Sequence, residues 1–491
     1  MTLVAPSAFA VDPIPSTPDA PEGPPGPLAG KAGGKAAAAA ASRAARTRRL
    51  LEGPIGPTLA RLAAPNVIAM FVMAAMSIAE GFFAGQLGVT ALAGLALVFP
   101  LVMLTQMMSA GAMGGAISSA IARALGGQGG AARTGGLALA AWMIAAAAAA
   151  FFAVLMALWG QSVFEALGGG EGAVAAALAY AAVFFPGCIA LWLCHSSLSI
   201  MRGAGDMLTP SLFLLGVSLA SIPLAGALAL GWGPFPALGM AGLAAGPVAA
   251  YGVGAVLAVV YILAGRSGIA FGAGRARFER SMFADILRVG LTASLNAVQT
   301  VLTIVLMVGL VGRHGQDALA GYGLGARLEF LMVPIVFGIG SAMTAMVGAN
   351  IGAGARQRAL RIGWTGASAA ALLVGAIGAV AALAPDLWLR LFLDGSDAAA
   401  LEAGRAYFHT VGPFYGFFAL GLALYFASQG AGRMVWPVAA SLCRMAIAFG
   451  GALLATELTD FGVAGVFGAI AAGMFAYGVI TAAAVRLTGW R

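Results

Sequence analysis

The sequence predicts an all-α integral membrane protein, whose twelve transmembrane helices form two pseudo-symmetric six-helix bundles that repeat in parallel. Three observations predict this fold class: an apolar composition, twelve long apolar runs, and an internal repeat of about half the chain. Hydrophobic residues make up 61% of the 491 residues and charged residues only 9%, whereas soluble domains carry about 25% charged residues. A chain this apolar cannot present a polar surface to water on all sides, so we expect it to lie in a bilayer.

The first 55 residues differ from the rest, and we expect them to form a disordered cytoplasmic tail. They are rich in Pro, Ala and Gly, and the basic run SRAARTRRL falls near their end. Such a segment cannot bury enough apolar area to fold. A cleaved signal peptide is the alternative, because APSAFA at 5–10 resembles a cleavage site. It is disfavoured, since no basic stretch precedes it and Pro6 interrupts the short apolar run.

Twelve apolar runs are long enough for helices that cross a bilayer, which takes about 20 residues. In the first half we expect these spans at 64–86, 92–120, 136–159, 173–198, 209–231 and 239–264. In the second half we expect them at 283–311, 318–347, 362–384, 402–426, 436–457 and 463–486. Only helices and closed barrels satisfy the backbone in lipid, and these runs are too long for barrel strands.

After the tail, the spans group into an N-terminal bundle at 56–265 and a C-terminal bundle at 283–491. The connection at 266–282 is basic. Around its end Phe278, Met282 and Ile286 recur at four-residue spacing among charges. This pattern allows a helix that lies at the membrane interface, or simply the first turns of the seventh span.

The basic residues predict the orientation of the chain. If the amino terminus is cytoplasmic, 22 of the 26 Lys and Arg residues fall in cytoplasmic segments, three fall in outer segments, and Arg327 falls within a span. Cytoplasmic loops of membrane proteins carry such an excess of Lys and Arg. We therefore expect both termini in the cytoplasm, and the net charge of +8 calls for no nucleic-acid partner.

An internal repeat relates the two halves. A shift of 227 residues pairs ALAG at 91–94 with ALAG at 318–321, and a shift of 226 pairs Gly114 with Gly340. Each half holds six spans, an even number, so both halves start from the same side and are related by an axis along the membrane normal. Two such bundles with a cleft between them indicate an alternating-access transporter, and the alternative is a duplicated structural membrane protein.

The repeat is clearest in two glycine-rich stretches, MRGAGDMLTP at 201–210 and SQGAGRMVWP at 428–437. We expect both to be joints between helices that gate the inner mouth, because glycine permits a tight reversal and proline fits the first turn of a helix. In the first joint Thr209 is expected to cap the next helix. No strand-to-helix context surrounds the glycines, which excludes a phosphate-binding loop. The joint residues are Arg202, Gly203, Gly205, Asp206, Pro210, Gln429, Gly430, Gly432 and Pro437.

These stretches resemble the multidrug and toxic compound extrusion (MATE) family. AEGFFAGQLG at 79–88, ARALGGQ at 122–128, GARLEF at 325–330 and VGANIGAG at 347–354 strengthen the likeness, which extends over about 50–490. The resemblance implies a multi-pass, monomeric protein of the bacterial inner membrane. It also implies export of amphiphilic, often cationic, compounds in exchange for H+ or Na+, with no other cofactor.

Two acids fall within predicted spans and away from the span ends, Glu80 and Glu329. An ionisable residue in a membrane span is costly and is therefore a functional candidate. The resemblance implies that the acid at the place of Glu80, usually Asp in the family, couples transport to a cation. A desolvated carboxylate there needs a proton, a Na+ ion or a cationic substrate as its partner. The alternative is an acid that simply reaches the outer water.

Glu329 follows Arg327 by two residues, and positions two apart do not face each other on a helix. We expect each to meet another helix in a structural polar network, with ion binding as the alternative. The candidate members of this network are Arg327, Glu329, Asn296 and Gln299. The candidate substrate-lining residues are Met103, Met107, Tyr407, Tyr415 and Tyr425. The candidate proton relays are His195 and His409.

No catalytic or metal-binding constellation appears, so we expect neither an enzyme nor a metal site. Cys188, Cys194 and Cys443 lie in or beside apolar runs and form no CxxC pair. A Na+ site made of several carboxylates is disfavoured, because the seventh span has no acid past Asp285 at its inner end and the tenth has none past Glu402. Two alternatives stay open: a flippase for a lipid-linked precursor, which calls for several mid-membrane arginines, and a non-transporting membrane scaffold.

Overall fold

The computed structural model describes residues 41, 44–127, 131–269, 271, 279–393, 397–458 and 461–491. Among these residues there are helices and turns but no strands. The expected disorder of residues 1–40 lies outside the described residues. So does Phe278 in the connection between the bundles.

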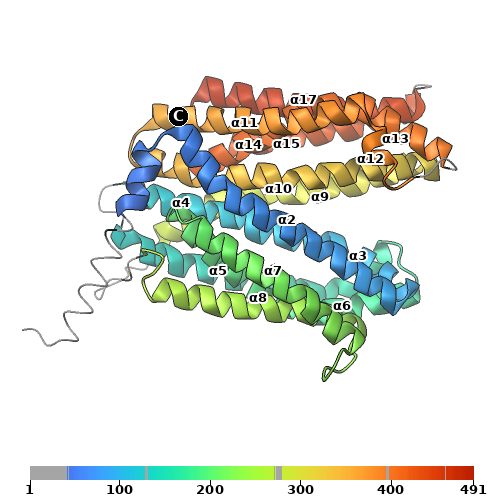
Figure 1. Ribbon diagram of the computed structural model, residues 1–491, viewed down its shortest axis with the longest axis horizontal. Coiled ribbons are helices and arrows are strands. Elements are labelled where there is room, and N and C mark those ends of the chain that lie inside the picture. The colour runs from blue at the N-terminus through green and yellow to red at the C-terminus, as the bar shows by residue number, and fades with distance from the viewer. Residues whose placement is uncertain are drawn as a thin grey trace, which may run out of the picture.

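The described helices lie mostly along the long axis of the molecule (Figure 1). Those of the first half are α2 (Ile55–Leu87), α3 (Val89–Gln106), η1 (Met107–Met113), α4 (Gly114–Gly126), α5 (Ala131–Ala166), α6 (Glu171–Gly203), α7 (Leu208–Leu230) and α8 (Gly239–Leu263). Those of the second half are α9 (Arg280–Gly312), α10 (Gln316–Gly352), α11 (Arg356–Leu383), α12 (Asp386–Leu389), α13 (Ala398–Val411), η2 (Gly412–Phe414), α14 (Tyr415–Ala431), α15 (Val435–Met445), η3 (Ala446–Gly450), α16 (Gly451–Leu458) and α17 (Gly462–Thr488).

Twelve helices of the described chain are long and apolar enough to cross a membrane, and each coincides with one predicted span. The second span consists of α3, η1 and α4 in line, where η1 is a π-helical segment. The tenth consists of α13, η2 and α14, and the eleventh of α15, η3 and α16. The predicted all-α, twelve-helix membrane fold is therefore confirmed.

Buried apolar side chains form two clusters that broadly follow the two halves. The first residues of α2, including Leu59 and Leu62, belong to the cluster of the second half. The first residues of α9, including Ile286 and Val289, belong to the cluster of the first half. The leading helix of each half thus begins against the other bundle, which joins the two bundles near the start of α2 and α9.

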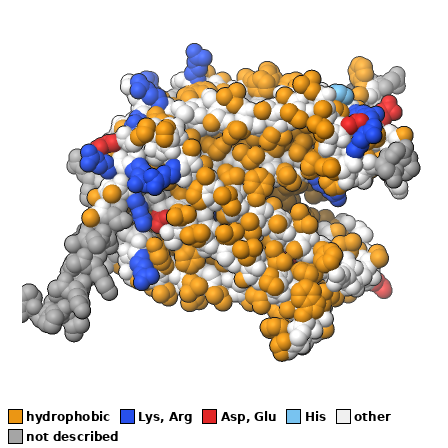
Figure 2. Space-filling view, in the orientation of Figure 1, with side chains coloured by type: hydrophobic (Ala, Val, Ile, Leu, Met, Phe, Trp, Pro, Cys, Tyr) orange, Lys and Arg blue, Asp and Glu red, His pale blue; other side chains and the backbone are white. Residues whose placement is uncertain are grey.

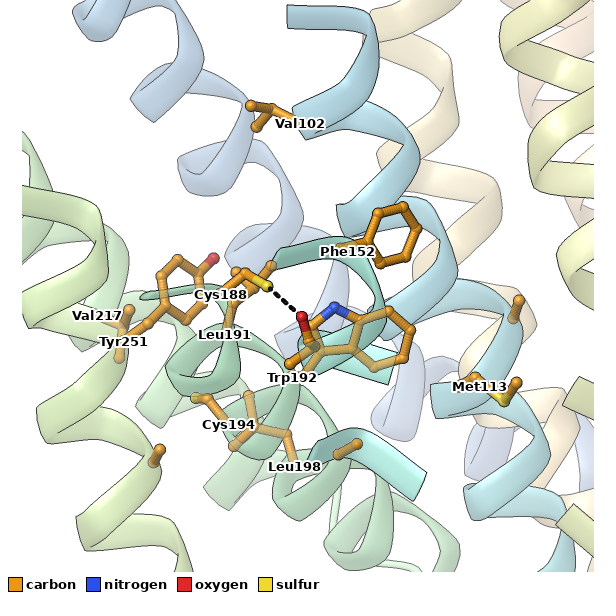
Figure 3. Packing of buried hydrophobic residues seen from close by; sticks show 14 of the residues in the cluster. Val102, Met113, Phe152, Cys188, Leu191, Trp192, Cys194, Leu198, Val217 and Tyr251 are labelled. Carbon is orange, nitrogen blue, oxygen red and sulfur yellow. Dashed lines mark hydrogen bonds between the residues drawn. The ribbon is translucent and has the colours of Figure 1, made fainter. Parts of the chain in front are cut away.

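Within the first bundle, α6 packs against α3, α5 and α8. Trp192 of α6 is fully buried, and its ring centroid lies 6.2 Å from that of Phe152 on α5. The thiol of Cys188 donates a hydrogen bond to the carbonyl of Ala149 at 3.6 Å (Figure 3). Cys188, Cys194 and Cys443 are all free thiols, so α6 is held by packing and not by covalent links.

The C-terminus and the start of the described chain lie at the same end of the molecule, which we name the terminal end (Figure 1). Most Lys and Arg side chains visible in Figure 2 gather there, while the flanks are hydrophobic. At the opposite end, Figure 2 shows a hollow between the two halves. A cavity of about 470 Å³ at this end is lined by the start of α10 and by Phe392 and Leu393.

Two connecting segments, residues 44–52 and the start of α9, can be compared with the predictions from the sequence. Residues 44–52 are helical, and Leu50 is 3% exposed, so the prediction of a disordered tail up to residue 55 is wrong for this part. The segment is ordered because Leu50 packs into the second cluster and Arg46 pairs with Asp206 at 3.1 Å. After the linker, α9 runs unbroken from Arg280, so Met282 and Ile286 belong to the first turns of the seventh span.

Candidate functional site

Glu80 lies in the part of α2 toward the opposite end, and 8% of it is exposed. It makes no hydrogen bond or ion pair with any described residue. The charge of Glu80 acts electrostatically on the hydroxyl groups of Tyr180 on α6 and Tyr251 on α8. The carboxyl group therefore points into the first bundle and has no basic partner within the described chain.

The wall of α7 beside α2 offers hydroxyl groups instead of carboxylates. Ser221 lies with its Oγ 2.8 Å from the sulfur of Met76, one turn before Glu80. The hydroxyl of Ser218, one turn earlier on α7, is buried and has no partner among the described residues. This side of the site can therefore orient a small polar guest but brings no second negative charge.

The helix that carries Glu80 is tied to both bundles near Pro65. A proline inside a helix removes one backbone hydrogen bond and permits bending. The next residue, Asn66, accepts a hydrogen bond from Ser211 of α7 at 2.8 Å and donates one to Ser341 of α10 at 3.0 Å. A bend in α2 therefore affects the contact between the bundles and the position of Glu80 together.

His195, one candidate proton relay, is buried inside the first bundle. Its Nδ1 lies 2.9 Å from the hydroxyl of Ser109 in η1, and its Nε2 has no partner among the described residues. Its ring meets that of Tyr251 edge-on, with centroids 5.3 Å apart. Tyr251 thus neighbours both His195 and Glu80. The other candidate, His409, is exposed on the second bundle, so the two histidines are not brought together.

Glu329 lies in the interior of the second bundle and accepts a hydrogen bond from the hydroxyl of Tyr407. Tyr322, Tyr415 and Arg444 lie close enough to interact with it electrostatically. Unlike Glu80, this carboxyl group has a direct hydrogen-bond donor and a nearby positive charge. Its surroundings fit a structural role.

The four residues of the expected polar network form separate contacts. Arg327 is exposed and its guanidinium lies 5.6 Å from the ring centroid of Phe392, away from Glu329. Gln299 donates to the hydroxyl of Thr303 one turn along α9, at 2.8 Å. Asn296 lies on the same helix and is half-buried. The contacts of the described residues therefore do not join Arg327, Gln299 and Glu329 into one network.

The candidate lining residues divide into two groups. Met103 and Met107 are half-buried on the second span. Tyr407, Tyr415 and Tyr425 are at most 4% exposed; Tyr407 and Tyr415 pack in the cluster of the second half, and Tyr425 packs in that of the first. These tyrosines do not line the 470 Å³ cavity, whose walls include Arg327 and Phe392 instead.

Arg444 is the residue that sequence reasoning missed. Its guanidinium lies over the rings of Phe418 and Tyr477, 5.4 and 5.6 Å from their centroids. Arg444 is one of the 22 basic residues expected in cytoplasmic segments, and this prediction is wrong for it, because α15 begins at Val435 and Arg444 lies inside the eleventh span. The signal was present, since Arg444 lies well inside the apolar run 436–457.

Contacts between the bundles close the terminal end. The hydroxyl of Ser119 on α4 donates to the carbonyl groups of Gln429 and Gly430 at 2.7 and 2.9 Å. In return, the side-chain amide of Gln429 donates to the carbonyl groups of Gly111 and Ala112 at 3.1 Å each. Every hydrogen bond between bundles in the described chain lies in the half toward this end, so the molecule is closed here and hollowed at the opposite end.

The two glycine-rich joints have matching geometry. Gly205 and Gly432 adopt the left-handed conformation, at φ +79° and +73°, in which a side chain is strained. Gly203 and Gly430 instead allow close helix approach, because a Cβ there would meet the carbonyl of Ser118 or of Thr344. Each glycine of the motif is therefore required for a different reason.

The cap of α7 differs from expectation. Asp206 accepts hydrogen bonds from the backbone N–H of Thr209 at 3.1 Å and from its hydroxyl at 2.8 Å. Asp206 therefore caps α7, and the prediction of Thr209 as the cap is wrong, because the carboxylate before the helix accepts from the backbone N–H of Thr209. Pro210 and Pro437 lie in the first turns of α7 and α15 as expected.

Comparison with known proteins identifies related sequences. The sequence profile of the MatE family matches residues 65–226 and 292–454, which are corresponding parts of the two halves. A FAD transporter of Shewanella oneidensis is 27% identical over 63% of this chain and 68% of its own length. A probable multidrug resistance protein NorM of Thermotoga maritima is 25% identical over 49% of this chain and 51% of its own length.

Solved structures share the fold. A MOP superfamily transporter from Pyrococcus furiosus superposes with a TM-score of 0.79 at 22% identity, over 90% of this chain and 97% of that one. The structure of a multidrug resistance MATE family transporter in an outward-facing conformation gives a TM-score of 0.78 at 23% identity, with the same coverage. The two-bundle arrangement is thus common to all three chains.

Proposed function

The chain belongs to the MatE family, whose members are transporters and not enzymes, and from this premise we propose that it is a proton-coupled antiporter. It exports amphiphilic, cationic compounds across the bacterial inner membrane, with both termini in the cytoplasm. The name of the Thermotoga relative, a probable multidrug resistance protein, supports export of foreign compounds. The excess of basic residues in the segments assigned to the cytoplasm supports the orientation.

The buried carboxyl group of Glu80 is the single observation that carries the proposal. Burial opposes its charged form unless a positive partner is bound, and the described chain supplies none. A proton and a cationic substrate are both suitable partners, and they exclude each other at one carboxylate. Alternate occupancy by the two is the simplest form of exchange.

The coupling ion is H+ in preference to Na+. The polar groups that interact with Glu80 are the hydroxyls of Tyr180 and Tyr251, and α7, which packs against α2, carries the hydroxyls of Ser218 and Ser221. Hard cations are bound by several oxygen ligands, usually including carboxylates. Among the described residues, no three His, Cys, Asp or Glu side chains gather in a group that could hold a metal ion. A single carboxyl group suffices for a proton.

Access alternates by separation of the bundles at one end and closure at the other. Such a transporter has one state open to the cytoplasm and one open to the outside. The closed terminal end and the hollowed opposite end (Figure 2) support the outward-open state. Pro65 and Asn66 link the position of α2 to the interface between the bundles. Loss or gain of the guest at Glu80 thereby biases the bundle arrangement.

The test is efflux of a fluorescent organic cation from proteoliposomes under an imposed pH gradient or an imposed Na+ gradient. The pH gradient should drive efflux and the Na+ gradient should not. Glu80→Gln should abolish the pH-driven flux, whereas Glu402→Gln, the same change at an exposed position, should preserve it. Failure of both gradients with the unmodified protein would leave the scaffold alternative.

An anionic aromatic substrate is a second candidate. The exposed guanidinium of Arg327 and the ring of Phe392 line the 470 Å³ cavity at the opposite end, and they suit a molecule with a negative charge and a planar ring. The similar protein of Shewanella is named as a FAD transporter. Uptake of FAD into the same proteoliposomes, and its loss in Arg327→Gln, distinguishes this candidate. A lipid-linked substrate would instead require flipping of a labelled lipid.

A further inference from the structure

A small cavity lies between the bundles near the terminal end, and its walls come from both halves. Arg202, Ser118 and Ser199 line it from the first bundle, and Gln429, Thr344 and Phe426 line it from the second. Its volume of about 20 Å³ admits one occupant of about the size of water. The cavity is distinct from the surroundings of Glu80, since none of its lining residues contacts that carboxyl group.

The lining residues are equivalent positions of the internal repeat. The shift of 227 pairs Arg202 with Gln429 and Ser199 with Phe426, and the shift of 226 pairs Ser118 with Thr344. Counterparts from the two halves thus meet around one cavity. The cavity therefore lies on the pseudo-symmetry axis that relates the bundles, where both halves contribute to a single site.

The polar groups of this cavity have unused hydrogen-bonding capacity. Arg202 is 4% exposed and makes no hydrogen bond or ion pair with any described residue, and its Nε is wholly buried. The hydroxyl groups of Ser118 and Ser199 are also buried and unpartnered in the described chain. The nearest acid in sequence, Asp206, is engaged by Arg46 and Thr209. A buried guanidinium without a counter-charge is strongly unfavourable.

We propose that this cavity binds one small inorganic anion of the size of chloride. The guanidinium of Arg202 supplies the charge, and the hydroxyl groups of Ser118 and Ser199 supply two further donors. A water molecule would fit but would leave the charge of Arg202 uncompensated, and sulfate, a dianion, would leave one negative charge without a counter-charge. Among the lining residues, Gln429 Oε1 is also unpartnered. It is an acceptor, and Arg202 has five N–H groups, enough to donate to both Gln429 Oε1 and the anion.

The anion stabilises the closed form of the terminal end. Its three donors come from the first bundle, and Gln429, Thr344 and Phe426 of the second bundle enclose it. Separation of the bundles at this end would open the cavity to water and weaken anion binding. A ligand that binds one arrangement better shifts the population toward that arrangement. This inference does not depend on the role of Glu80.

The test is thermal unfolding of the purified full-length protein in detergent, with chloride exchanged for gluconate at constant ionic strength. Chloride should raise Tm along a saturating curve, bromide should substitute for it, and sulfate should not. The double variant Ser118→Ala/Ser199→Ala keeps the charge and removes only two hydroxyls. Its half-saturating chloride concentration should rise by about tenfold or more, since hydrogen bonds to charged groups are strong.

Arg202→Gln should abolish the saturating response, and Arg433→Gln is the matched control. Arg433→Gln removes the same charge from the second joint, at an exposed position outside the cavity. The Tm of this variant should depend on chloride as that of the unmodified protein does. Identical chloride curves for the unmodified protein and the double serine variant would overturn the proposal. So would equal Tm values in chloride and gluconate, which would mean that water occupies the cavity. Because Tm reports binding without transport, neither result depends on whether efflux is proton-driven.

Discussion

Asn66 donates a hydrogen bond from its side-chain amide to the hydroxyl of Ser341 at 3.0 Å, across the interface between the two bundles. Both side chains are at most 8% exposed. The contact follows Pro65 in α2, the helix that carries Glu80 fourteen residues further on. The relation between the bundles is thus fixed by the same helix that holds the candidate coupling carboxylate.

A covalent link at this contact should stop transport. Asn66→Cys combined with Ser341→Cys, cross-linked by oxidation or a short bifunctional thiol reagent, should lose efflux because the bundles can no longer separate there. Reduction of a disulfide should restore it. The measurement is efflux from proteoliposomes before and after reduction, and each single variant is the control. Undiminished efflux by the fully cross-linked protein would show that the bundles need not separate at this point.

Replacement of Glu80 should separate coupling from stability. Glu80→Gln removes a buried ionisable group that has no basic partner, so we expect Tm to stay unchanged or to rise while pH-driven efflux is lost. Glu80→Asp keeps the carboxyl group on a shorter side chain and should retain coupling at a reduced rate. Tm and efflux are measured on the same preparations. Full coupling in Glu80→Gln contradicts the proposed site.

Replacement of Tyr407 beside Glu329 should lower stability and leave coupling intact, the reverse of the result expected for Glu80. Tyr407→Phe removes the hydroxyl that donates to Glu329 and should destabilise the protein by about 1–3 kcal/mol, because a buried acceptor is left unsatisfied. Coupling to the pH gradient should persist. Loss of coupling with unchanged Tm would favour ion binding at Glu329 instead. The outcome is read from denaturation of the purified protein and from efflux.

The turn at α12 should make stability depend on pH. Arg405 donates to Asp386 from two nitrogens at 2.7 Å each, and Arg390 donates from one at 3.0 Å. These hydrogen bonds, with those from Arg405 the stronger, lower the pKa of Asp386 to about 2. The value in an unfolded chain is roughly 4. The pairing therefore stabilises the fold above pH roughly 4, and its contribution is lost as the pH falls toward about 2.

Comparison with Asp386→Asn isolates this contribution. The variant should unfold at a lower temperature than the unmodified protein near pH 6. The difference should shrink between pH roughly 4 and about 2, as Asp386 becomes protonated in the unmodified protein. Tm measured across this range checks the prediction. A difference that stays constant down to pH 2 contradicts it.

Hydropathy predicted all twelve spans because lipid imposes one length and one composition on each of them. Hydropathy does not predict contacts between segments that are distant in the chain. Asn66 is a single polar residue in an apolar run, and its partners Ser211 and Ser341 lie 145 and 275 residues away in the chain. Only the packed structure brings them together.

The positions of charged and titratable side chains were harder to predict than the spans. Counting arginines by loop assigned Arg444 to water, whereas aromatic faces hold it inside the second bundle. The sequence made His195 a candidate proton relay but gave no partner for it, and a π-helical segment in the second span brings Ser109 to it. Such local widening of a helix leaves no mark on hydropathy.

Arg202 and Gln429 occupy the same place in the two halves and differ in charge. In a symmetric homodimer of half-length chains, each chain would place the same guanidinium group at the symmetry axis. The two positive charges would repel each other and oppose assembly. Covalent fusion releases the two positions from being identical. Fusion of the two halves into one chain therefore allows a single guanidinium, that of Arg202, at the interface between two otherwise equivalent bundles.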